Sequence, residues 1–399
     1  MRVSNDTLRT QFLAALDAAQ RRILDTQTQV STGKRINSPS DDPVAAARVA
    51  HLDASLARLD QYNANAVFAR NQLGLEEETL SEVVDTLQRV RELVLQASND
   101  SAGDSDRRII AAELREYRSA LVSLANVTDV DGRHLFGGYL EEAAPFVVDA
   151  SGGVVYNGDQ GQRTLQISDT RFVAINDSGA EVFQRIANGN GTFAAAASPA
   201  NTGTGVLGAA NVVDATAWIP DDYTITFVGG TSYEVRDGSS ALVAAGAFTP
   251  PGQSLSFRGI DVRIDGQPAA GDTFTVTPST SRDVFATLDG LIAALEAPAG
   301  TPAARALMHS NVGQQLADLD AALSHVIDTR AEIGARVRAL DQQESLAADF
   351  AVHLETTLSS VRDLDYAEAL SKLSQQLFGL DAAQQAFSST QNLSLFRYI

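Results

Sequence analysis

Two short motifs carry residue types that could do chemistry. Residues 203–208, GTGVLG, have the G-x-G-x-x-G spacing whose glycine amides bind a pyrophosphate at a helix start. The residues before them are alanine, serine and proline, not a buried strand, which favours loop glycines over a dinucleotide site. Residues 129–134, DVDGRH, suggest a calcium loop. A calcium loop of this kind has twelve positions, with glycine at the sixth. If Gly132 is the sixth, Val127 and Gly138 occupy the first and twelfth positions, where acids are required, so we predict a simple turn.

Histidine chemistry is also absent from the pattern. No two of the histidines stand at the i, i+4 spacing of a metal-binding helix, and no nucleophile elbow suggests a Ser-His-Asp triad. The sequence therefore predicts no catalytic, cofactor-binding or metal-binding residues, and a structural role. The five histidines are His51, His134, His309, His325 and His353.

Composition limits the partners of the 399-residue chain. Its formal charge of -20 disfavours non-specific binding to nucleic acid or to an anionic membrane. No apolar stretch reaches the length of a membrane span, and the first thirty residues lack the apolar region of a secretory signal. The absence of cysteine fits a cytosolic protein or one exported without oxidation. Hydrophobic residues make up 44% but aromatic ones only 6%, which is typical of long helices.

Apolar residues near both chain ends recur at spacings of three and four, the pattern of a coiled-coil seam. Such seams at free ends commonly stay unpaired until another subunit supplies the other half, so we predict an assembly interface there that is flexible in the monomer. Its predicted residues are Leu8, Phe12, Leu16, Ile23, Leu370, Leu373, Leu377, Leu380 and Phe387. In the N-terminal stripe Ala19, Thr26 and Val30 occupy the intervening seam positions.

A hinge follows the N-terminal stripe. Gly33 can turn left-handed and end the first helix, and the paired prolines Pro39 and Pro43 limit the backbone after it. Asp42 stands before Pro43, so its carboxylate is predicted to accept from Val44 or Ala45 and to cap the next helix. The stretch 33–42 is therefore predicted to join two helices.

Further along the chain the spacing of the apolar residues changes twice, from a helical to a strand pattern and back. Helical patterns run from Asp42 to about Ser98 and again near 110–124, and they return from about Arg282 with a break at 297–302. Between about Phe146 and Pro278, short alternating runs predict strands, with 194–205 as a surface loop. The glycine pairs 152–153 and 229–230 are predicted to supply positive φ in hairpin turns. The predicted fold is α+β: an elongated antiparallel helical rod formed by both chain ends, an inserted mainly-β domain and coiled-coil terminal helices.

Four stretches resemble the flagellin superfamily, and most closely its hook-filament junction members. They are STGKRINSPSDDPVAAARVA at 31–50, DVDGRHLFGG at 129–138, RAEIGARVRALD at 330–341 and the ending from DLDYAEAL at 363–370 to LFRYI at 395–399. The resemblance covers about the first 140 and last 120 residues. It implies terminal coiled-coil assembly segments at 1–42 and 360–399, a helical rod domain at 43–142 and 282–359, and an outward-facing β domain at 143–281.

The same resemblance implies a function. A structural junction protein of the bacterial flagellum, needed for motility, would join the hook to the filament by coiled-coil polymerisation of its termini. The implied partners are copies of itself in a ring-like assembly, the first hook-associated protein, flagellin, and an export chaperone before secretion. Type III export would place it outside the cell at the hook-filament junction. Flagellin, the main filament subunit, is the alternative, and a cytosolic coiled-coil scaffold is a more distant one.

Overall fold

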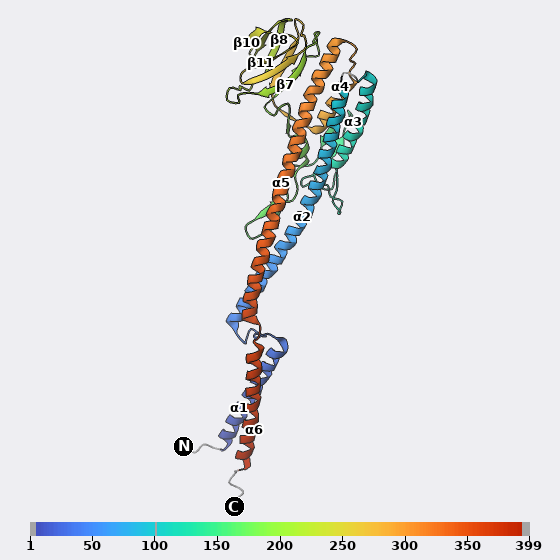
Figure 1. The fold of residues 1–399 in the computed structure, drawn as a ribbon. Coiled ribbons are helices and arrows are strands. Elements are labelled where there is room, and N and C mark those ends of the chain that lie inside the picture. Colours follow the sequence, from blue (N-terminus) through green and yellow to red (C-terminus); the bar gives the residue numbers. More distant parts are fainter. Residues whose placement is uncertain (1–4, 100–101, 393–399) are drawn as a thin grey trace, which may run out of the picture. The chain divides into compact units, whose positions relative to one another are not determined.

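The computed structural model describes residues 5–99 and 102–392, which form two compact units (Figure 1). The terminal unit contains residues 1–64 and 342–399, and the central unit contains residues 65–341. The helices are α1 Asn5–Thr32, α2 Pro43–Ala97, α3 Asp104–Ala125, α4 Val284–Glu296, α5 Pro302–Arg362 and α6 Tyr366–Asn392, with a π-helical turn at Ala180–Gln184. The predicted long helix from Asp42 to about Ser98 is confirmed as α2, which has 55 residues.

Helices α2, α3, α4 and α5 supply one core of the central unit. Leu73, Leu87, Leu114 and Leu319 are fully buried in it. They belong to the apolar face of each helix, which packs against the other helices. Ion pairs join the solvent-exposed edges of α2 and α5. Arg91 pairs with Asp320 at 2.6 Å and Arg330 with Glu77 at 2.6 Å.

The strands lie between α3 and α5 in the sequence. β1 pairs with β2, β3 with β4 and β5 with β14, in two-stranded antiparallel sheets. The strands are β1 Phe146–Val148, β2 Val154–Tyr156, β3 Thr164–Gln166, β4 Phe172–Ala174, β5 Ile186–Ala187, β6 Phe193–Ala197, β7 Val206–Val212, β8 Tyr223–Gly229, β9 Ser232–Arg236, β10 Leu242–Ala247, β11 Gly252–Phe257, β12 Ile260–Asp265, β13 Thr273–Pro278 and β14 Ser281–Arg282. The prediction of helical chain ends with a mainly-β insert is therefore confirmed.

Two larger sheets form the β head of the central unit. One has the order β10-β9-β8-β13-β6 and the other β11-β12-β7, with every pairing antiparallel. Their inner faces share one apolar core, in which Ile225, Phe227, Val262 and Phe274 are fully buried. Alternation of buried and exposed residues along these strands is what made them recognisable in the sequence.

Two local predictions are wrong in part. The loop expected over 194–205 is found only at 198–205, because residues 193–197 form strand β6, in which Ala197 pairs with Phe274 of β13. A run of alanines has no alternation in hydropathy, so its burial depends on the neighbouring strand. Gly152 has the expected positive φ of 88°, but Gly153, Gly229 and Gly230 do not have positive φ.

A buried acid joins α2 to the loop that follows β4. Glu76 is 2% exposed, its Oε1 accepts a hydrogen bond from the Asp177 N–H at 3.0 Å, and its Oε2 has no hydrogen-bond partner. Arg336 of α5 binds the Asp177 carboxylate through two nitrogens at 2.8 and 2.9 Å. Burial, with the Asp177 charge beside it, raises the pKa of Glu76 well above its ordinary value. The Glu76 carboxyl is therefore protonated at a pH where an exposed one has ionised.

This pKa makes the stability of the central unit depend on pH. The pKa of Glu76 is higher in the folded chain than in the unfolded chain. The free energy of unfolding is therefore highest below the unfolded-state pKa, and it falls as pH rises from there through the folded-state pKa. Between these two pKa values the free energy of unfolding should fall by about 1.4 kcal/mol per pH unit. Glu76→Gln, whose side chain cannot ionise, should remove this fall. Thermal melting from pH 5 to pH 9 measures it. Glu78→Gln, which changes an exposed carboxyl of the same helix, is the control. If the thermal midpoint changes with pH in the same way in the parent and in Glu76→Gln, the raised pKa of Glu76 is contradicted.

Candidate assembly site

The motifs considered for chemistry have structural roles. The N–H groups of Thr202 and Gly203 donate to the buried Asp272 carboxylate at 2.8 and 3.0 Å, so the G-x-G-x-x-G amide at Gly203 is already bonded. In the DVDGRH turn, Asp129 Oδ1 accepts from the N–H groups of Asp131 and Arg133. Within residues 5–99 and 102–392 no group of three His, Cys, Asp or Glu side chains could hold a metal, and no helix could cross a membrane.

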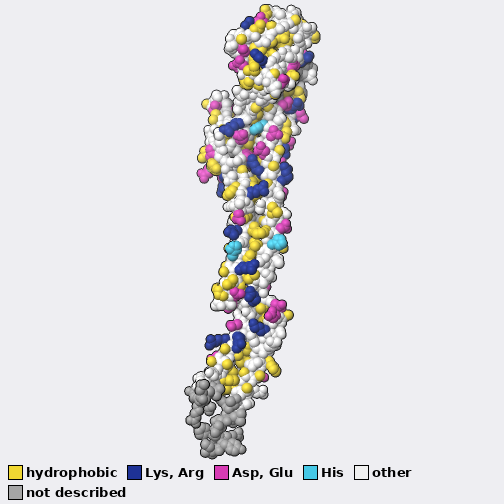
Figure 2. Space-filling view, turned by 90° about the vertical axis from the view of Figure 1, so that its left-hand side faces the viewer, with side chains coloured by type: hydrophobic (Ala, Val, Ile, Leu, Met, Phe, Trp, Pro, Cys, Tyr) yellow, Lys and Arg dark blue, Asp and Glu magenta, His cyan; other side chains and the backbone are white. Residues whose placement is uncertain are grey.

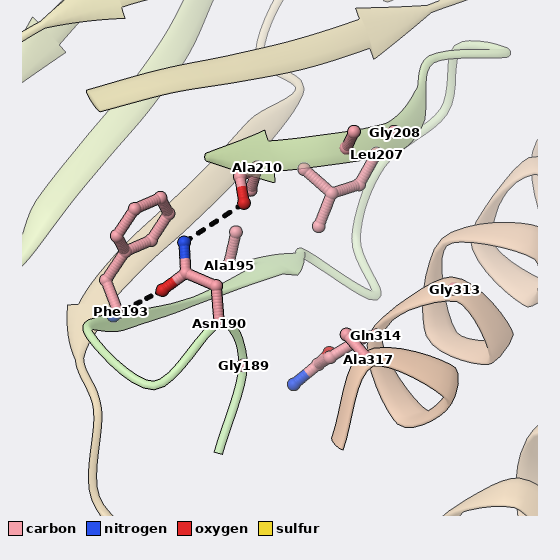
Figure 3. A pocket seen from close by; sticks show the side chains of 11 residues that line it. Gly189, Asn190, Phe193, Ala195, Leu207, Gly208, Ala210, Gly313, Gln314 and Ala317 are labelled. Atoms are coloured by element: carbon pink, nitrogen blue, oxygen red, sulfur yellow. Dashed lines mark hydrogen bonds between the residues drawn. The ribbon is translucent and has the colours of Figure 1, made fainter. Parts of the chain in front are cut away.

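A cavity of about 270 Å³ lies between the β head and α5 (Figure 3). None of its eleven lining residues is charged, and most are glycine or alanine. Asn190 is bonded on both sides of its amide, donating to the Ala210 carbonyl at 3.0 Å and accepting from the Phe193 N–H at 2.9 Å. The polar side chains in its lining are the amides of Asn190 and Gln314.

Helices α1 and α6 pack side by side in the terminal unit and run in opposite directions (Figure 1). The faces that meet repeat at alternating intervals of four and three residues, as in a coiled coil. On α1 they carry Phe12, Leu16, Ala19, Ile23, Thr26 and Val30, and on α6 Ala369, Leu373, Gln376, Leu380, Ala383 and Phe387, all buried or half-buried. We call this set the seam. At one end the Phe12 and Phe387 rings stack with centroids 4.5 Å apart.

The structure thus separates the predicted interface residues into two groups. Six of them lie in the seam, whereas Leu370 and Leu377 point away from α1 and are 49% and 46% exposed. The side chain of Leu8 lies outside the described residues. On α6 the sequence missed Ala369, Gln376 and Ala383, because alanine and glutamine give little hydrophobic signal.

A second apolar surface lies on the outer sides of the two helices. On α6, Leu370 and Leu377 are seven residues apart and therefore share one side, beside the 79% exposed Phe378. On α1, Leu13 and Leu24 are eleven residues apart, which is also close to a whole number of turns. We call these five residues the outer stripe. Figure 2 shows hydrophobic side chains on the surface of this part of the terminal unit.

The hinge after α1 is held by backbone pairing with the segment before α6. The Leu364 N–H donates to the Gly33 carbonyl at 3.0 Å, and the Arg35 N–H donates to the Arg362 carbonyl at 2.7 Å. Gly33 has a φ of 70°, and a Cβ there would lie 2.8 Å from the Tyr366 hydroxyl. Glycine is therefore favoured at this point by its conformation, while the exposed Tyr366 side chain could move to make room for a Cβ.

The start of α2 is capped as predicted. Asp42 Oδ1 accepts from the Ala45 N–H at 3.0 Å, and Arg35 lies 3.6 Å from the other carboxylate oxygen. The hydrogen bond from Ala45 lowers the pKa of Asp42 below its ordinary value. Pro43 takes the first helical position. Pro39 is exposed in the turn before it, where Asp41 accepts from the N–H groups at 37 and 38.

The fold and the paired ends define a class of structural subunit. Residues 3–141 match the family described as the bacterial flagellin N-terminal helical region, and residues 196–278 match the D2-like domain of flagellar hook-associated protein 1. Helical ends that pair around a β insert are thus those of a flagellin-class subunit. Within this class, the chain belongs to the family of flagellar hook-associated protein 3, FlgL.

Three relatives support this family. FlgL from Xanthomonas campestris is 39% identical with a TM-score of 0.71, and the match covers 77% of this chain and 99% of that one. The flagellar junction protein FlgL from Legionella pneumophila is 30% identical with a TM-score of 0.73, covering 79% and 100%. Flagellar hook-associated protein 3 of Salmonella typhimurium is 27% identical over 100% of this chain and 99% of its own. The chain is therefore a structural component of the bacterial flagellum.

The Asp42 cap generates a prediction for the hinge. In Asp42→Ala the Ala45 N–H loses its acceptor, so amide hydrogen exchange in the first turn of α2 should speed up about fivefold. Asp53→Ala removes a carboxylate from an exposed position inside the same helix and serves as control. Acid should mimic the variant, because the cap is lost as pH falls through the lowered pKa. Equal exchange rates in Asp42→Ala and the parent chain would contradict the capping role.

Proposed function

We propose that this chain joins the flagellar hook to the filament and assembles by polymerisation of its terminal helices. Its neighbours in the assembly would be further copies of itself, the first hook-associated protein on the hook side and flagellin on the filament side. The family supports the location, since one solved relative is named a flagellar junction protein. Flagellins match the chain more weakly, which favours the junction over the main filament.

The outer stripe is the observation that carries the proposed assembly. Its five apolar side chains are exposed although the seam beside them is filled by the chain's own helices. Each large apolar side chain that leaves water on assembly contributes about 1.5–3 kcal/mol. A second copy, presenting the same stripe or the flank of its own helix pair, would remove these side chains from water in every subunit.

Charge favours contact between copies at the terminal unit. Residues 65–341 contain 19 Lys and Arg against 36 Asp and Glu, whereas residues 1–64 and 342–399 contain 11 against 14. Like charges therefore oppose close packing of central units far more than packing of terminal units. This distribution supports the proposed roles of 1–42 and 360–399 in assembly, 43–142 and 282–359 as rod, and 143–281 as the outward domain.

Export before assembly is the remaining part of the proposal. We infer that the chain is secreted unfolded by the flagellar type III apparatus, bound to a chaperone beforehand, and folds outside the cell. The chain contains no cysteine, so threading and refolding need no disulfide chemistry. It acts as a scaffold without catalysis, as the structural names of its relatives support.

Assembly should fail when the outer stripe is charged. Leu377→Asp with Phe378→Asp places two carboxylates where apolar contacts are proposed, and their burial without partners is costly. Both side chains are exposed within one chain, so the thermal midpoint should stay within about 2 °C of the parent's. Electron microscopy of cells carrying the variant should show hooks without filaments, and flagellin should appear in the medium.

A matched control has the same added charge elsewhere. Val213→Asp with Val228→Asp changes two exposed apolar residues of the β head and should leave filaments intact. Normal filaments in the Leu377/Phe378 variant would remove the outer stripe from the interface. A large fall in its melting temperature would instead assign these side chains to the chain's own core.

The ends of the free chain are predicted to open readily. Each helix of the α1–α6 pair packs against the other alone within the terminal pair, and several of the seam side chains are only half-buried, so brief opening should expose the backbone. Limited trypsin treatment of the monomer should cut first at Arg9, Arg21 and Arg22, and mass spectrometry identifies the sites. If these bonds survive while sites in the central unit are cut, the ends are stably docked in the monomer.

A further inference from the structure

A polar layer interrupts the apolar seam between α1 and α6. Thr26 is 3% exposed, and its hydroxyl lies within donating distance of two acceptors, Gln376 Oε1 at 3.0 Å and the Arg22 carbonyl at 2.8 Å. The neighbouring seam positions are apolar, with Ile23 on α1 and Leu373 and Leu380 on α6. Two polar side chains thus occupy facing positions where apolar ones would bind more tightly.

A polar pair inside a coiled coil costs stability, but it distinguishes one alignment of the helices from the others. A slip of one heptad in either direction would move the helices about 10 Å past each other. Gln376 would then face position 19 or 33, and Thr26 would face position 369 or 383. These positions hold alanine or glycine, whose side chains offer no hydrogen bond. The half-buried Gln376 amide oxygen would therefore lose the Thr26 hydroxyl, and that hydroxyl would keep only the Arg22 carbonyl of its own helix.

We propose that the Thr26–Gln376 pair sets the register in which α1 packs against α6 of the same chain. The pair acts as a positioning element: it aligns the two helices, and the rest of the seam supplies the apolar burial. Register also fixes how Leu13 and Leu24 on α1 lie relative to Leu370 and Leu377 on α6. This last consequence rests on the proposed assembly role of the outer stripe, whereas the register itself does not.

Disulfide trapping tests the register, because the chain contains no cysteine of its own. Ala19 and Ala383 lie one heptad from Thr26 and Gln376, so Ala19→Cys and Ala383→Cys face each other only in the observed alignment. Mild oxidation of this parent should give the intramolecular disulfide in most chains. Adding Thr26→Val and Gln376→Leu should lower that yield about threefold or more and give disulfide-linked dimers. The thermal midpoint should not fall, because the new layer is apolar.

Two controls separate register from general stability. Exchanging the pair, Thr26→Gln with Gln376→Thr, should restore the parent yield, and Thr26→Ser should keep it. An unchanged yield in the Val/Leu variant would overturn the proposal, as would a lost disulfide accompanied by a lower midpoint, which marks an ordinary stabilising contact. A parent that forms no intramolecular disulfide would overturn the pairing itself.

The same variants distinguish this proposal from the assembly role. Polymerisation is measured separately on each oxidised and reduced sample by sedimentation. A chain with the correct disulfide that does not polymerise would count against the proposed function and leave the register assignment in place. A Val/Leu variant that polymerises normally although it forms little of the intramolecular disulfide would contradict the link between register and the outer stripe.

Discussion

The antiparallel pairing of α1 with α6 determines where the rest of the chain must begin and end. It brings the two ends of the chain together, and hydrogen bonds from Leu364 to Gly33 and from Arg35 to Arg362 hold them at the hinge. The chain between residues 35 and 362 must therefore begin and end at the hinge. Helix α2 begins just after the hinge and α5 ends at it, and the β strands lie between them in the sequence.

The two sides of this helix pair have different tasks. The seam is filled within one chain and is interrupted by the Thr26–Gln376 layer, which favours one alignment over a tighter but less specific core. The outer stripe is apolar without being covered by the chain itself. Near-neutral charge on the terminal unit and strong negative charge on the central unit then direct contact between copies to the stripe.

Strong periodicity allowed much of the fold to be predicted from the sequence. The cap at Asp42, the 55-residue α2 and the start of the β region at Phe146 were all readable, because each depends on local residue types. The end of the β region was predicted at Pro278, but the short strand β14 at Ser281–Arg282 follows it. Strand β6 was not, because its alanines acquire their burial only from β13. The facing side of α6 was also missed, since Gln376 becomes a seam residue only through Thr26, far away in the chain.

Amine cross-linking of assembled chains tests the account most directly, because the chain has only two lysines, Lys34 at the hinge and Lys372 between Leu370 and Leu377. Chains with light and heavy nitrogen are mixed, assembled, cross-linked and analysed by mass spectrometry, so that links between copies carry both labels. We predict mixed-label links at Lys372 that appear on assembly and are absent from the free chains. Assembled chains whose lysine links all lie within one copy, while carboxyl-directed reagents join their central units, would contradict assembly through the terminal helices.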